Sequence, residues 1–196
     1  MLGELHGKLV FGRRIATLAR EIAGRLPRNA RVLDVGCGSG DLAALIVTLR
    51  PDVTIRGIDV LVRLDTAIPV EAYDGANIPH ADGAFDAAIV VDVLHHTDDP
   101  EAVLAEIARV AKVVILKDHL RDGIAAGITL RFMDWVGNAA HGVRLPYNYL
   151  SRCEWSAIWD RLTLKPSEFG SRLSLYPRPF SWAFDRGLHF VTILSR

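Results

Sequence analysis

Two kinds of side chain in this sequence have types and spacings suited to chemistry at one site: aspartates at the ends of apolar runs, and histidines close to them. Asp34 precedes three closely spaced glycines, Gly36, Gly38 and Gly40. Carboxylates accept hydrogen bonds from hydroxyl and ammonium groups, and glycines let a ligand approach the backbone. This combination predicts a binding site for a small molecule that carries such groups.

The elements around the glycines are those of a nucleotide-binding α/β unit. Residues 32–35 form a short apolar run that is typical of a buried parallel strand. The glycines follow, and residues 42–49 then have the apolar spacing of an amphipathic helix. Strand, glycine turn and helix in this order place a ligand at the carboxyl end of the strand.

The glycine spacing indicates which ligand is bound. A dinucleotide-binding turn has the pattern G-x-G-x-x-G and holds a pyrophosphate on the helix N-terminus. Here the pattern is G-x-G-x-G, and Asp41 stands where the third glycine of that fingerprint would fall. A carboxylate there repels a pyrophosphate but tolerates a zwitterionic amino acid, which favours S-adenosylmethionine over NAD.

The segment Asp34-Val-Gly-Cys-Gly-Ser-Gly40 resembles the first motif of the class I S-adenosylmethionine-dependent methyltransferases, and the chain is similar to their small type 11 group. The resemblance is strong over residues 31–118 and weak afterwards. It implies that S-adenosyl-L-methionine is the cofactor and S-adenosyl-L-homocysteine the product. The cofactor-binding residues expected in this turn are Asp34, Gly36, Cys37, Gly38 and Gly40.

Asp59 is the next candidate, and its position supports a role in binding the cofactor's ribose. It ends an apolar strand predicted over residues 53–60, roughly twenty residues past the glycine turn, where an acid can accept from both ribose hydroxyls. Val60 follows it on the same edge. Asp59 could also cap the next helix, and the two roles are compatible.

Three further cofactor contacts are implied by the resemblance. Tyr73-Asp74-Gly75 matches a motif in which an acid accepts from the adenine amino group, here Asp74, with Gly75 beside it. Asp92 and His95, at the end of the strand predicted over residues 87–93, are implied contacts for the methionine ammonium and the cofactor. The segment between Asp59 and Asp74 is short, so we expect one helical turn at 61–65 and a weak strand at 69–73.

The candidates for the catalytic base are histidines. His96 follows the strand at 87–93, and the strand at 112–117 delivers His119 to the same sheet edge. His119 could instead hold a loop by one hydrogen bond. His141 and Tyr147 lie in a polar-aromatic loop of a length that is often functional. No metal is expected, because no carboxylate or third histidine has helical spacing to His95 and His96.

The expected fold class is α/β: a Rossmann-like, seven-stranded, mostly parallel sheet with helices on both faces and a terminal antiparallel strand pair. We expect a single methyltransferase domain over residues 1–196. Its parts are an N-terminal helical cap (1–29), a cofactor-binding core (30–120), a helix and loop region for the acceptor (121–162) and closing strands (163–196).

Charge and composition exclude several classes of partner. Lys plus Arg equals Asp plus Glu at 23 each, so no general field attracts nucleic acid. Two cysteines form no disulfide framework or zinc motif, and no apolar run is long enough to span a bilayer. We expect a cytoplasmic monomer or homodimer. Most aromatic residues lie after residue 130, so the acceptor could be aromatic or lipid-like, although these rings could equally be core.

The predicted function is methylation of a small-molecule acceptor at oxygen, nitrogen or carbon by in-line methyl transfer. A non-catalytic relative that only binds the cofactor is the main alternative. A nicotinamide-dependent oxidoreductase is disfavoured by Asp41 and the missing third glycine. Methylation of nucleic-acid bases is disfavoured because Asp-Val-Leu-His stands where such enzymes carry Asn or Asp followed by Pro-Pro and an aromatic residue.

Overall fold

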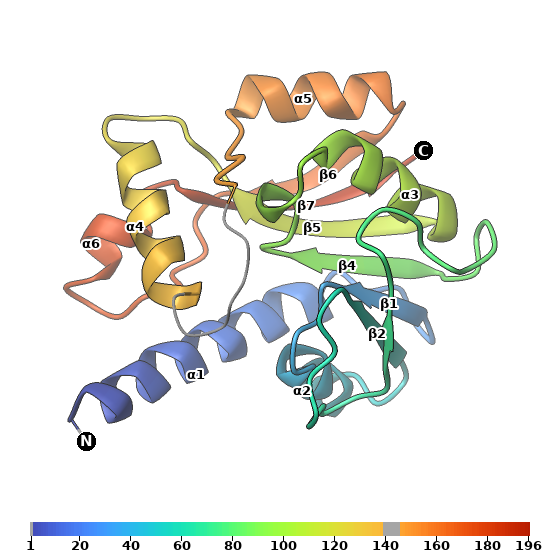
Figure 1. The fold of residues 1–196 in the computed structure, drawn as a ribbon, viewed down its shortest axis with the longest axis horizontal. Helices are drawn as coiled ribbons and strands as arrows, with labels where there is room; N and C mark the ends of the chain where they lie inside the picture. Colours follow the sequence, from blue (N-terminus) through green and yellow to red (C-terminus); the bar gives the residue numbers. More distant parts are fainter. Residues whose placement is uncertain (1, 139–145) are drawn as a thin grey trace.

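The computed structural model describes residues 2–138 and 146–196, in which seven strands form one sheet in the order β3-β2-β1-β4-β5-β7-β6 (Figure 1). All neighbouring strands are parallel except β7, which is antiparallel to β5 and β6. This confirms the predicted fold class. The strands are β1 Arg31–Val35, β2 Thr54–Asp59, β3 Val70–Ala72, β4 Ala87–Val91, β5 Val113–His119, β6 Lys165–Gly170 and β7 His189–Ser195.

Helices cover both faces of this sheet, which buries the central strands on two sides. The helices α1 and α2 pack on one face, and α3 and α5 pack on the other (Figure 1). The α-helices are α1 Leu2–Ala23, α2 Asp41–Leu49, α3 Pro100–Val110, α4 Ala126–Asn138, α5 Arg152–Arg161 and α6 Ser181–Phe184, and η1 Leu94–His96 is a 3-10 turn. None of the helices in the described ranges is both long and apolar enough to cross a bilayer.

The helix starts follow the sequence signals. Asp99 caps α3 by accepting from the Ala102 amide at 3.0 Å, with Pro100 in the first turn. Ser151 and Glu154 form the predicted capping box of α5. The cap fixes a helix whose Trp155 is buried against Phe190 of β7. Several aromatic rings after residue 130 therefore belong to the core, which was one of the two alternatives predicted for them.

The segment between β2 and β3 differs from expectation. Residues 61–65 form no helical turn, whereas the weak third strand is present as the three-residue β3. The chain after these residues is tied to its neighbours, because the Ala67 amide donates to the Ser39 carbonyl at 2.8 Å and the Gly57 amide donates to the Pro69 carbonyl at 2.9 Å.

The turn after β1 depends on left-handed backbone that has no room for side chains. Gly36 and Gly40 have φ values of 69° and 77°. A Cβ on Gly36 would lie 2.5 Å from Val93 Cγ2, and one on Gly40 would lie 2.6 Å from Ile68 Cγ1. The glycines therefore let the ends of β1 and β4 and the segment before β3 approach each other closely.

We predict that Gly36→Ala lowers the free energy of unfolding by about 2 kcal/mol or more, because it adds a clash with Val93 to left-handed strain. Gly83→Ala is the matched control, since Gly83 has a φ of 63° but open space within 4 Å of the point that a Cβ would occupy. Urea denaturation of both variants separates the two contributions. Equal losses of stability would contradict the claim that close packing constrains this turn.

Candidate functional site

The carboxyl ends of β1, β2, β3 and β4 meet at the glycine turn. The Gly38 amide donates to Asp59 Oδ2 at 2.8 Å, which joins the turn to the end of β2. A Cβ on Gly75 would lie 3.1 Å from Val60 Cγ1, so the loop after β3 packs on the residue after β2. The structure thus brings together Gly36, Gly38, Gly40, Asp59, Val60 and Gly75.

Asp59 has the chemistry needed to hold a pair of hydroxyl groups. Its Oδ1 accepts from the Leu61 amide at 2.9 Å, and its Oδ2 accepts from Gly38. A carboxylate has about four lone-pair sites, so two amide donors fix its orientation and leave capacity for a ligand. The bond from the Leu61 amide resembles the capping role predicted for Asp59, although a loop and not a helix follows it.

Asp34 and Cys37 lie beneath the turn in an environment that disfavours charge. Burial, together with the nearby Asp59 carboxylate, raises the pKa of Asp34 to about 8. Burial raises the pKa of the Cys37 thiol to about 12. Both groups are therefore neutral at pH 7, and a cation placed beside Asp34 would favour its ionised form.

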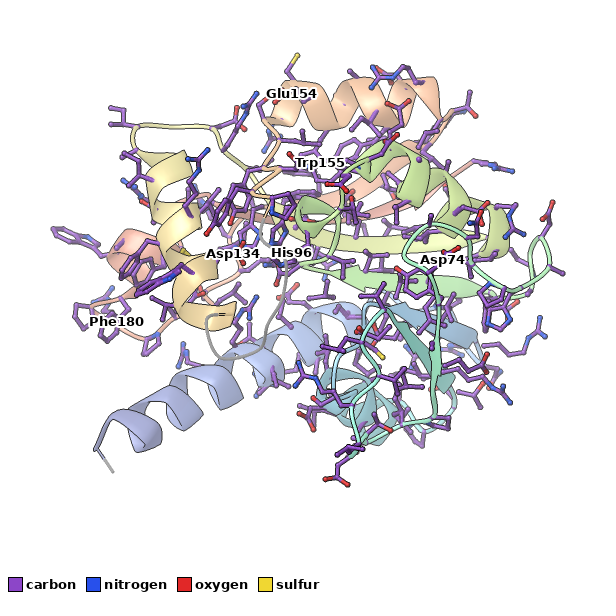
Figure 2. All side chains as sticks on the ribbon, viewed as in Figure 1. Asp74, His96, Asp134, Glu154, Trp155 and Phe180 are labelled. Atoms are coloured by element: carbon purple, nitrogen blue, oxygen red, sulfur yellow. The ribbon has the colours of Figure 1, made fainter. Side chains whose placement is uncertain are left out.

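Asp74 is engaged mainly with its own loop. Its Oδ1 accepts from the amides of Ala76 (2.8 Å) and Asn77 (2.6 Å), and its Oδ2 accepts from the Asn77 side chain at 2.8 Å. These hydrogen bonds lower its pKa to about 2, so it is a carboxylate at neutral pH. Figure 2 shows Asp74 well apart from His96 along the sheet. Its adenine contact stays a prediction.

Asp92 lies between two cations rather than facing an open site. Lys117 of β5 contacts its Oδ1, and Arg14 of α1 contacts its Oδ2. Burial opposes ionisation of Asp92, but Lys117 and Arg14 outweigh it and lower the pKa of Asp92. Asp92 also has a φ of 57°, which is strained for a residue with a side chain. If Asp92 binds the methionine ammonium group as predicted, that group would share the carboxylate with Lys117 and Arg14.

Lys117 is completely buried and extends this polar chain to β7. Its Nζ donates to His189 Nδ1 at 3.2 Å. Burial lowers the pKa of Lys117, while Asp92 opposes that shift. Burial and the neighbouring Lys117 hold the pKa of His189 well below its ordinary value. The chain Arg14–Asp92–Lys117–His189 therefore links α1 to β4, β5 and β7.

His95 and His119 form a second buried group around Asp118 of β5. His95 Nδ1 lies 2.7 Å from Asp118 Oδ1, and His119 Nδ1 lies 3.3 Å from the same atom. Burial would lower the pKa of His95, but Asp118 raises it to about 10. Burial and Lys117 hold the pKa of His119 well below its ordinary value. His95 is only 1% exposed, so its predicted cofactor contact stays a prediction.

Two more of the predicted catalytic residues, His96 and Tyr147, lie around α4. His96 Nε2 is 3.6 Å from Asp134 Oδ1, and Figure 2 shows these two side chains side by side. Tyr147 lines a cavity of about 340 Å³ together with Tyr149 and one face of α4, including Ile128 and Arg131. His141 lies within residues 139–145, outside the described residues. Ring contacts connect His96, His119 and Tyr147, because His95 lies beside His96 and His119, and Tyr149 lies beside His119 and Tyr147.

Sequence reasoning missed Arg14, Lys117, Asp134 and His189 as residues of the site. Only Lys117 carried a signal, because a lysine within the apolar run Val113–His119 is rarely buried without a charged partner. Asp134 and Arg14 sit in helices, where one polar residue among apolar ones usually faces solvent. Their role appears only when α1 and α4 pack against the end of β4.

Comparison with known proteins finds a matching family model and relatives of similar sequence. A family model described as a methyltransferase domain matches residues 8–165. The 27-O-demethylrifamycin SV methyltransferase of Amycolatopsis mediterranei is 31% identical over 183 residues, covering 84% of this chain and 65% of that protein. An O-methyltransferase of Aspergillus nomiae is 36% identical over 132 residues, covering 60% of this chain and 54% of that protein. The chain thus spans between half and two thirds of these curated relatives.

A solved structure has the same fold across nearly the whole chain. It is the complex between the Haloferax volcanii Trm112 methyltransferase activator and a putative methyltransferase, with a TM-score of 0.69. The match covers 98% of this chain and 93% of that chain at 16% sequence identity. At this identity the likeness is one of fold.

We predict that Asp92→Asn lowers the free energy of unfolding by about 3–5 kcal/mol, because it leaves the buried Lys117 and the partly buried Arg14 without their anion. Glu101→Gln is the control: it breaks an ion pair with Arg161 at the surface, where solvent screens the charges, and should leave the free energy of unfolding nearly unchanged. Both are measured by urea denaturation. If both variants lowered the free energy of unfolding by the same small amount, the chain Arg14–Asp92–Lys117–His189 would not be stabilising the contact between α1 and strands β4, β5 and β7.

Proposed function

The chain belongs to the methyltransferase-domain family, and we propose that it transfers a methyl group from S-adenosyl-L-methionine to a small-molecule acceptor. The observation that carries this proposal is the glycine turn joined to Asp59 through the Gly38 amide. The Aspergillus nomiae relative, which is named as an O-methyltransferase, supports an oxygen acceptor. The curated relatives are longer than this chain, so the acceptor is inferred from this chain's own residues.

The residues present fit the cofactor. The turn at Gly38 is open, with Arg63 as the nearest side chain at 3.6 Å from a Cβ placed there, so a ligand can approach the backbone. Asp59 would hold the ribose hydroxyls, with Val60 and Gly75 beside the base. Asp34 would ionise near the amino acid's ammonium group, because its raised pKa reflects burial without a cationic partner.

When bound, the cofactor supplies an electrophilic methyl group on a sulfonium, and the reaction is an in-line displacement. The chain therefore has to align the acceptor and exclude water. The loop that carries Tyr147 and Tyr149 is docked on η1 for this purpose. The Asn148 amide donates to the His95 carbonyl at 3.1 Å, and the Asn148 side chain donates to the Thr97 carbonyl at 2.7 Å.

The cavity beside α4 is the proposed acceptor site. Tyr147, Tyr149, Arg121 and Arg131 are among its lining residues. The Arg131 guanidinium lies over the Tyr147 ring, 5.5 Å from its centroid, and Arg121 is paired with Glu154. Tyr149 also stacks on His95 with ring centroids 5.1 Å apart, which places the cavity next to the end of β4. Aromatic walls with cations favour a flat acceptor that carries an anionic or phenolic group. Tyr147 would orient it, and His96, His119 and His141 remain the proposed bases.

We predict that calorimetry detects binding of S-adenosyl-L-homocysteine in the micromolar range and no binding of NAD. Asp59→Asn should weaken that binding by several-fold or more, because the amide is a poorer acceptor for two hydroxyls. Asp65→Asn is the matched control, since Asp65 is an exposed carboxylate in the loop that follows β2.

Two results would count against the proposal. Binding of NAD in place of S-adenosyl-L-homocysteine would remove its basis. An effect of Asp65→Asn as large as that of Asp59→Asn would show that general charge, not the Asp59 geometry, governs binding. Cofactor binding without product formation across a broad screen of phenolic and carboxylic acceptors would instead favour a non-catalytic binding protein.

A further inference from the structure

A cluster of potential metal ligands lies beside the proposed acceptor cavity. It consists of His95 and His96 in η1 and Asp134 on α4, and we name it the His95–His96–Asp134 cluster. One ligand atom from each residue lies within 4.8 Å of the others. Asp134 Oδ1 is 3.7 Å from His95 Nε2 and 3.6 Å from His96 Nε2. The sequence predicted no metal only because Asp134 is distant along the chain.

The His95 ring is oriented as a metal-binding imidazole is. Its Nδ1 lies 2.7 Å from the buried Asp118 Oδ1, so a proton on Nδ1 is shared with that carboxylate. Its Nε2 is buried and has no hydrogen-bond partner in the described structure, and an ion bound there would displace the Nε2 proton that His95 carries as a cation. A carboxylate that holds one ring nitrogen and leaves the other aimed at a cation is the common supporting arrangement of metal-binding histidines.

Asp134 is held in a similar way. The Tyr149 hydroxyl donates to Asp134 Oδ2 at 2.9 Å, which leaves Oδ1 facing both histidine rings. Asp134 lies on α4, whereas Tyr149 lies in the loop that lines the acceptor cavity.

The distances suit a shared ion better than direct hydrogen bonds. Separations of 3.6 and 3.7 Å are too long for hydrogen bonds. Ligands about 2.0–2.1 Å from a tetrahedral zinc ion are about 3.3–3.4 Å apart. By contrast, His95 Nδ1 and Asp118 Oδ1 are only 2.7 Å apart, which is a hydrogen-bond length, so the neighbouring group of His95, Asp118 and His119 is held by protons.

We propose that His95, His96 and Asp134 bind one divalent transition-metal ion. Two imidazoles and one carboxylate suit zinc, cobalt or nickel rather than magnesium or calcium, which prefer oxygen ligands. Three protein ligands leave a fourth position for water or for an acceptor oxygen from the cavity. The ion would link η1 to α4. It would also occupy the lone pair of His96, so His96 would act as a metal ligand and not as the predicted base.

The test uses the full chain without a histidine tag, treated with chelator and then freed of it. Zinc binding is measured by calorimetry, and cobalt binding is measured by its visible absorption. We expect one ion per chain and d–d bands of a four- or five-coordinate cobalt site. His96→Gln should weaken binding at least about tenfold, and Tyr149→Phe should weaken it about tenfold through loss of the hydrogen bond to Asp134.

Matched controls separate this site from general histidine binding. His80→Gln changes a histidine that lies 4.0 Å from the single carboxylate of Glu71, and it should leave zinc affinity unchanged. His119→Gln changes the neighbouring group of His95, Asp118 and His119. It should also leave one zinc ion bound to the His95–His96–Asp134 cluster. Asp134→Asn should abolish the cobalt bands, and its thermal unfolding shows whether the fold is kept.

The proposal is overturned if the chain binds no zinc at one equivalent, or if His96→Gln binds as tightly as the unchanged chain. It is also overturned if His119→Gln, rather than His96→Gln, removes the ion. These measurements need neither cofactor nor acceptor. Their failure would leave binding of S-adenosyl-L-homocysteine untouched, and a failure of cofactor binding would leave the metal result standing.

Discussion

The close approach of backbone at the turn after β1 is the constraint on which the site depends. Gly36 and Gly40 adopt left-handed conformations against Val93 and Ile68, where a Cβ would lie 2.5–2.6 Å from a neighbouring carbon. Only this packing lets the Gly38 amide reach the Asp59 carboxylate and lets the loops after β2 and β3 share one edge. The surface proposed to bind the cofactor is therefore formed by backbone placement first and by side chains second.

Next to this surface, the carboxyl ends of β4 and β5 are held by buried charge. Asp92 joins Arg14 of α1 to Lys117 of β5, and Asp118 joins His95 to His119. Each cation has an anion within contact, as burial of charge in a low-dielectric interior demands. The consequence is that α1 and the end of β4 are fixed relative to the glycine turn, and that the histidines beside the acceptor cavity have defined orientations.

Much of the fold and of the candidate site was predictable from the sequence, and the physical reasons for this also explain why the rest was not. The glycine turn, Asp59 and the sheet follow from local patterns: apolar runs, glycine spacing and helix caps such as Ser151 with Glu154. The partners of Asp92 and the place of Asp134 depend on contacts between distant elements, which no local spacing encodes. The helical turn expected at residues 61–65 was wrong: these residues form bends, and the segment that follows them is bonded to the backbone of Ser39 and Gly57. The single domain and its parts stay predictions.

The central claim is that the turn after β1 and the end of β2 together bind a sulfonium amino acid nucleoside. The most direct measurement is a crystal structure of the chain grown with S-adenosyl-L-homocysteine. The account predicts density across the carboxyl ends of β1 and β2, with both ribose hydroxyls on Asp59 and the amino acid near Gly36 and Asp34. Density at any other place in the fold, with the glycine turn left to solvent, would contradict it.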